Sequence, residues 1–164
     1  MKKGVYIILC FLTLISCSQD ITFNNVAVFQ GVKDNQGWKA DDSKATMSLN
    51  ALITIEAVTL NETMTLRMPM PSAFVYQKNL NTHITYVLNS PTQKATYSIL
   101  TNDIDAEYET GNTGAAGEVV ITDFDGATIS GTFRFNASNT ENPSTDPPIV
   151  NLQSGVFYKV PIVQ

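Results

Sequence analysis

Four acidic residues recur at every second position in the middle of the chain: Asp103, Asp105, Glu107 and Glu109. Alternate side chains of a strand point to the same face of a sheet, so a strand over residues 103–110 would group these carboxylates. Carboxylate oxygens are the hard ligands that calcium binds in proteins. The full calcium-loop pattern, with a distal glutamate, is not met. We therefore favour a solvated face on an edge strand, where charge prevents edge-to-edge association, and keep calcium as the alternative.

Few other residues could support catalysis. His83 is the single histidine, and a Ser-His-Asp or Cys-His system would have to use it. No Gly-x-Ser-x-Gly motif accompanies it, so we expect His83 on the surface or at a strand edge. Two carboxylates could act as the acid and base of a glycosidase, but any acidic β protein offers such pairs. We predict that the chain is not an enzyme and has no cofactor.

Aromatic residues suggest a different chemistry. Trp38 is the single tryptophan. If it were exposed beside Tyr76, Tyr86 or Tyr108, the rings could stack on a sugar, because such rings combine an apolar face with a polar edge. We favour the alternative that Trp38 is half-buried and closes one end of the core.

Both cysteines, Cys10 and Cys17, lie near the N-terminus. Lys2 and Lys3 precede an apolar run over residues 4–14, and a small residue precedes Cys17, as is typical of a secretory signal. The run is too short to span a bilayer as a permanent helix, which needs about 20 residues. Residues 14–17 read Leu-Ile-Ser-Cys and resemble the bacterial lipobox.

That resemblance implies cleavage before Cys17 and acylation of the cysteine. Two or three acyl chains give stable membrane anchoring, whereas one does not. We predict a signal peptide over residues 1–16, a lipidated tether over 17–25 and a single domain over 26–164. Removal of Cys10 with the signal would leave no free thiol, and therefore no disulfide and no thiolate metal site.

Composition limits the possible partners. Charged residues make up 15% of the 164-residue chain, and the formal net charge is −5. Nucleic-acid binding depends on clustered cations, which this chain lacks, so we expect no nucleic-acid partner. Phosphate-binding and zinc-binding motifs are also missing from the sequence.

Hydrophobic residues alternate with polar ones along most of the chain, which indicates half-buried strands. Residues 128–136 are the clearest example, with Ile129, Gly131, Phe133 and Phe135 on one face. Near the C-terminus, Val156, Tyr158, Val160 and Ile162 are expected to share a face. Strands are predicted near residues 26–30, 37–40, 45–58, 63–68, 73–77, 83–89, 95–100, 105–110, 117–123, 127–137, 149–153 and 156–162.

Turn residues fall every eight to twelve positions, which favours an all-β fold of antiparallel neighbours. Asp125-Gly126 predicts a hairpin between residues 118–122 and 128–135. The predicted fold is a meander-rich antiparallel β-sandwich or flattened β-barrel in a single domain. Long loops are expected over residues 111–117 and 136–148, and another turn is expected over residues 153–155.

Several of these segments together resemble a family of uncharacterised lipoproteins from the Bacteroidota, known as a domain of unknown function. The resemblance implies an all-β envelope lipoprotein, held in the outer membrane, and offers no catalytic residues. Surface lipoproteins of that phylum often carry an acidic run after the cysteine, whereas this chain has only Asp20, so the surface and periplasmic orientations both stay open. The matching segments are Phe29-Gln30, Trp38-Lys39-Ala40, Gly117–Thr122, Asp125, Ile129–Ala137 and Val150–Phe157.

The expected function is non-enzymatic binding by a membrane-anchored envelope lipoprotein, with a protein or glycan partner. Long loops support this expectation, since binding residues concentrate there. Two alternatives remain. The first is a calycin-like carrier of a small apolar ligand, lined by Met64, Leu66, Met68, Phe133 and Phe135. The second is a hydrolase with paired carboxylates.

Overall fold

The computed structural model describes residues 26–71, 83–101, 105–112, 114–140 and 148–163, and every regular element in them is a β-strand. The predicted all-β class is therefore confirmed. None of these residues forms a helix of the length and apolarity needed to cross a membrane. In chain order the strands are β1 Val28–Lys33, β2 Gln36–Lys39, β3 Asp42–Met47, β4 Leu52–Val58, β5 Glu62–Pro69, β6 Ile84–Val87, β7 Lys94–Leu100, β8 Asp105–Glu109, β9 Gly117–Phe124, β10 Thr128–Asn139 and β11 Ile149–Val163.

The long β10–β11 hairpin closes the sheet on itself. Beyond its pairing with β10, the end of β11 lies parallel to β3 at Ile162 and Val163. The end of β10 pairs with β8 at Ser138 and Asn139. Because β3, β4, β5, β7 and β8 are neighbours in that order, the chain forms a closed ring of strands. Of the two predicted architectures, the flattened barrel is the one observed, with β11–β3 as a short parallel exception.

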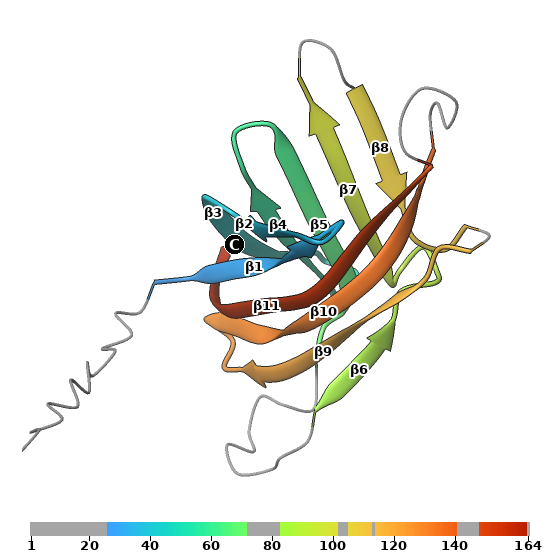
Figure 1. Cartoon of the computed structure of the whole chain (residues 1–164). Helices are drawn as coiled ribbons and strands as arrows, with labels where there is room; N and C mark the ends of the chain where they lie inside the picture. The colour runs from blue at the N-terminus through green and yellow to red at the C-terminus, as the bar shows by residue number, and fades with distance from the viewer. Residues whose placement is uncertain (1–25, 72–82, 102–104, 113, 141–147, 164) are drawn as a thin grey trace, which may run out of the picture.

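Two further pairs of strands extend the ring. β1 and β2 continue outward from the middle of β11, and β9 and β6 continue outward from β10. The result is two layers, one of β3, β4, β5, β7 and β8 and the other of β1, β11, β10, β9 and β6 (Figure 1). The two layers share one core, which accounts for the single domain.

The predicted inward faces are confirmed for the central strands. Met64, Leu66 and Met68 are fully buried on β5, and Phe133 and Phe135 are at most 3% exposed on β10. All five belong to the same apolar core, which spans both layers. The orientation expected for the apolar-carrier alternative is therefore observed, while the carrier role itself stays a prediction.

Two glycine–phenylalanine pairs lie where β10 and β11 cross the core. Gly131 is opposite Phe157, and Phe133 is opposite Gly155. A Cβ atom on Gly155 would lie 2.5 Å from three ring atoms of Phe133. The ring of Phe133 also packs against Phe29, with centroids 4.9 Å apart. Each glycine therefore leaves the space that the ring on the partner strand occupies, which explains both Gly-x-Phe segments of the sequence.

Two β-bulges in β11 overturn part of the sequence prediction. Ser154 and Lys159 have positive φ angles of 52° and 48°, and the register of β10 with β11 shifts at both positions. An extra residue at a bulge reverses the alternation of side chains beyond it. Phe157 is consequently buried, whereas Val156 and Tyr158 are exposed. The prediction that Val156 and Tyr158 share a face with Val160 was wrong for this reason, and the turn predicted over 153–155 is a bulge within one strand.

Other predicted boundaries also differ. The strand predicted over 45–58 is two strands, because a turn at residues 48–51 places Ala51 at a φ of 54° and joins its N–H to the carbonyl of Ser48. The segments 149–153 and 156–162 merge into β11. The loop predicted over 136–148 begins later, because residues 136–138 continue the ladder with β11. The strand predicted over 73–77 lies outside the described residues.

The hairpin predicted from Asp125-Gly126 is confirmed. β9 and β10 pair from Phe124 and Ile129 onward. The Asp125 carboxylate accepts hydrogen bonds from the backbone N–H groups of Ala127 and Thr128, at 2.9 and 2.6 Å. These bonds, the Thr128 N–H first, hold the pKa of Asp125 below its ordinary value.

Candidate functional site

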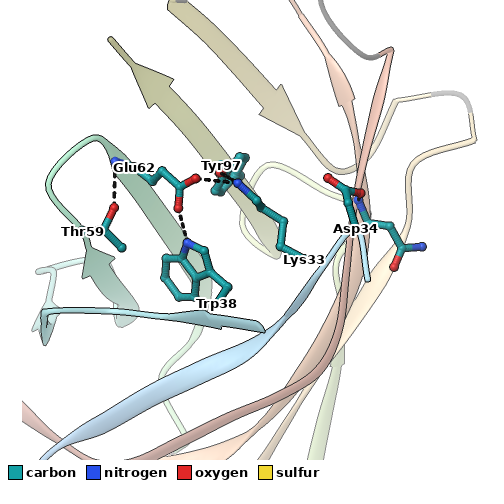
Figure 2. Close-up of polar contacts among 7 residues, drawn as sticks. Lys33, Asp34, Trp38, Thr59, Glu62 and Tyr97 are labelled. Carbon is teal, nitrogen blue, oxygen red and sulfur yellow. Dashed lines mark hydrogen bonds and ion pairs between the residues drawn. The ribbon is translucent and has the colours of Figure 1, made fainter. Parts of the chain in front are cut away.

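A polar cluster joins the β1–β2 hairpin to the opposite layer (Figure 2). Lys33, at the end of β1, donates to Glu62 Oε1 at 2.5 Å and to the Tyr97 hydroxyl at 2.6 Å. The indole N–H of Trp38 on β2 donates to the other carboxylate oxygen of Glu62. The Thr59 hydroxyl accepts the backbone N–H of Glu62 at 3.1 Å, which fixes the start of β5.

Electrostatics explain why this cluster persists in a half-buried place. Burial alone would raise the pKa of Glu62, but hydrogen bonds with Lys33, Tyr97 and Trp38 outweigh it and lower that pKa. Burial, followed by the neighbouring carboxylate, raises the pKa of Tyr97, which therefore stays protonated. The carboxylate is ionised, and both its oxygens are engaged by groups of the protein. We interpret the cluster as a structural clamp on the hairpin.

Trp38 packs against the core as favoured from the sequence, but it is buried rather than half-buried. Its side chain is only 6% exposed, and its ring meets Phe29 edge-on with centroids 6.0 Å apart. Tyr108 is buried at 2% exposure and Tyr86 is half-buried, so neither forms an open aromatic platform with it. Tyr76 lies outside the described residues. The sequence did not indicate Glu62 as the partner of Trp38, because the two are 24 positions apart and on different strands.

The acidic residues of β8 alternate with buried ones as predicted, but the edge position expected for this strand was wrong, because β8 lies between β7 and β10 in the sheet. Asp105, Glu107 and Glu109 alternate with buried Ala106 and Tyr108. The Glu109 carboxylate forms an ion pair with Lys94 on the adjacent strand β7.

Within the described parts of the chain, no three His, Cys, Asp or Glu side chains stand together as a metal site would require. Two of the predicted site residues, Asp103 and Cys17, lie outside those parts. His83 is exposed immediately before β6, as expected.

A groove crosses the outer face of the β1–β11–β10–β9 layer. It consists of three hollows of about 280, 470 and 350 Å³. The first two share Glu118, Arg134 and Gln153, and the third adjoins the second at Ser154 and continues to Gln30. We call these five residues the outer groove. The bulge at Ser154 lies at its centre.

Hydrogen-bonding side chains line the middle of the outer groove, beside apolar residues such as Val120 and Val156. The Arg134 guanidinium donates to the Glu118 carboxylate at 2.9 Å, and both side chains are exposed to solvent. Beside them, Asn151 donates to the side-chain oxygen of Asn136 at 2.7 Å. The three hollows therefore present two cations, Arg134 and Lys39, one anion, Glu118, and several neutral amides on sheet strands. Sequence reasoning missed this groove: Arg134 occupies an outward position of the predicted alternation, whereas Gln153 and Ser154 fell in a predicted turn.

Comparison with known proteins gives a family but no activity. No curated protein and no solved structure matches the chain. A family model described as a domain of unknown function (DUF6252) matches residues 25–161. This match covers the whole barrel apart from its last residues, and the chain therefore belongs to the DUF6252 family.

Proposed function

We propose that this protein is a lipid-anchored envelope lipoprotein of the Bacteroidota type, held through Cys17. The lysine-led apolar segment and the Leu-Ile-Ser-Cys sequence over residues 14–17 support the anchor. The family match begins at residue 25, so the proposed leader and tether both fall before the matched domain. We place the lipid in the outer membrane.

The barrel serves as a binding module, and the observation that carries this role is the outer groove. Three adjoining hollows on one sheet face form a longer concave surface than any one hollow provides. Sheet strands hold the lining side chains rigidly, which lowers the entropy cost of binding. The clamp at Glu62 has no free carboxylate oxygen to offer a substrate, so the described polar groups favour binding over catalysis.

A glycan chain is the ligand that suits the groove best. Amide, guanidinium and carboxylate groups together donate to and accept from sugar hydroxyls. The opposite charges of Arg134 and Glu118 neutralise each other, and Lys39 alone is too little positive charge for a nucleic-acid ligand, which needs clustered cations. An extended groove also suits a linear polymer. An extended peptide is the alternative occupant that the test distinguishes.

Anchoring is tested by intact-mass analysis and cell fractionation. The native protein is expected to gain a diacylglyceryl mass and to partition with membranes, whereas a Cys17→Ser variant is expected to lose both properties. Protease treatment of intact cells then decides orientation. Loss of the barrel places it outside, and protection until permeabilisation places it in the periplasm. A soluble wild-type protein without acyl mass would overturn the proposal.

Binding is tested on an array of envelope polysaccharides and unrelated peptides. Arg134→Ala and Gln153→Ala are expected to weaken glycan binding at least tenfold without lowering the melting temperature, since both side chains reach solvent. Lys44→Ala is the matched control, because Lys44 forms a similar exposed ion pair, with Glu56, outside the groove. Binding to peptides alone, or equal losses in the control, would contradict a glycan site in this groove.

A further inference from the structure

Exposed hydrophobic side chains lie around the first described residues and the end of β11. Val26 is 65% exposed, and β1 starts two residues later with Val28 paired to Tyr158 of β11. The start of β1 and the end of β11 lie at the same end of the molecule (Figure 1). Val163, the last described residue of β11, is 42% exposed.

An aromatic side chain and a cation lie within this surface. Tyr158 is 37% exposed, and the Lys159 ammonium lies 5.6 Å from the centre of its ring. Tyr158 faces outward because the bulge at Ser154 places Phe157 in the core, and the bulge at Lys159 then returns Val160 to the core. Tyrosine and lysine both suit the boundary between water and lipid, since each has an apolar body and a polar tip. We call Val26, Val28, Tyr158, Lys159, Pro161 and Val163 the exit face.

Chain length places this face near any lipid on Cys17. Eight residues, 18–25, separate Cys17 from Val26. Eight residues span about 29 Å when fully extended, and this is the upper limit of the distance that the segment can bridge. A short tether also raises the effective concentration of the two surfaces into the millimolar range, so a weak contact suffices.

We propose that the exit face rests on the headgroup layer of the membrane that holds Cys17, and that the barrel is thereby oriented rather than freely tumbling on its tether. This rests on the proposed lipid anchor. Tyr158 and the valines enter the interface, and the Lys159 ammonium meets lipid phosphates. The opposite end of β11, at Ile149, then points away from the membrane. The outer groove lies between the two ends.

The test uses the full acylated protein in phosphatidylcholine–phosphatidylethanolamine vesicles that carry a headgroup-attached nitroxide quencher. Since the mature chain has no other free thiol, Val163→Cys provides one site for a fluorophore. Ile149→Cys is the matched control: it is another exposed aliphatic residue, 49% exposed, at the far end of the same strand. Fourteen residues of strand separate the two sites by up to about 46 Å.

The expected result is at least threefold stronger quenching at position 163 than at position 149. Adding Tyr158→Ser and Lys159→Ser should remove most of that difference without changing the acyl mass. Equal quenching at both positions of an acylated protein would overturn the proposed membrane contact of the exit face and leave the anchor standing. Quenching that depends on the protein-to-lipid ratio would assign the face to a second copy of the chain instead. Absence of the acyl mass would overturn the proposed anchor, so the two failures are distinguishable.

Discussion

Gly155→Ala tests the strand crossing at the centre of the core. The alanine Cβ would lie 2.5 Å from three atoms of the Phe133 ring, far inside van der Waals contact. Phe133 is 3% exposed and packs against Phe29 and Phe157, so its ring cannot move away freely. Overpacking of this kind costs about 2 kcal/mol of unfolding free energy. For a domain of this size the melting temperature should fall by about 8 °C.

A second substitution separates a ring contact from a backbone contact. The atoms nearest to Gly155 all belong to the Phe133 ring, so Phe133→Leu should relieve the clash. Gly131 differs, because its Cβ would lie 2.3 Å from the backbone oxygen of Val120 as well as near the Phe157 ring. Gly131→Ala should therefore cost about 3 kcal/mol, and Phe157→Leu should not rescue it.

Urea unfolding of the single and double variants measures the coupling. We expect about 2 kcal/mol of favourable coupling between Gly155→Ala and Phe133→Leu, and little between Gly131→Ala and Phe157→Leu. Gly37→Ala is the control, because nothing lies within 4 Å of the Cβ position at Gly37. This variant should have the same free energy of unfolding as the wild type. Equal rescue at both crossings, or no loss in Gly155→Ala, would refute the assigned register of β10 with β11.

Three further outcomes follow from the polar contacts. Glu62→Gln should cost about 2 kcal/mol at neutral pH, since a charge-assisted bond to Lys33 is lost. Because folding lowers the pKa of Glu62 below 4.5, the ionised carboxylate adds to the free energy of unfolding above that pH. This contribution disappears as the pH falls through the folded pKa. Urea unfolding at several pH values should show a loss of stability in acid for the wild type and a smaller loss for the variant. Asp125→Ala should lower the melting temperature by about 4 °C, and a Thr128→Val variant that keeps the backbone bonds should lower it less. Chelation by EDTA should leave the melting temperature unchanged, and a fall that calcium reverses would assign a calcium site to the β8 acids after all.

The two parts of the candidate site differed in how far the sequence predicted them. Lipidation of Cys17 could be proposed from the sequence alone, because the lipobox resemblance is read from adjacent residues. The outer groove was not, because Gln30, Glu118 and Gln153 lie on three strands that only pairing brings together. The outward positions of the alternation were the available signal, but they do not say which strands become neighbours. The contact of Glu62 with Trp38 was likewise out of reach, because the two residues are 24 positions apart.

What the sequence determined by itself was local. Alternation of period two predicted most strands and the buried faces of β5 and β10, and Asp125-Gly126 predicted the β9–β10 turn. The tertiary structure decided the closure of the sheet, the Glu62 clamp and the two bulges of β11. A bulge changes which residues face inward only through its pairing with another strand, and that pairing joins residues distant in the chain. Tyr158 therefore faces solvent because of how β11 meets β1 and β10, although its own neighbours in sequence predicted the opposite.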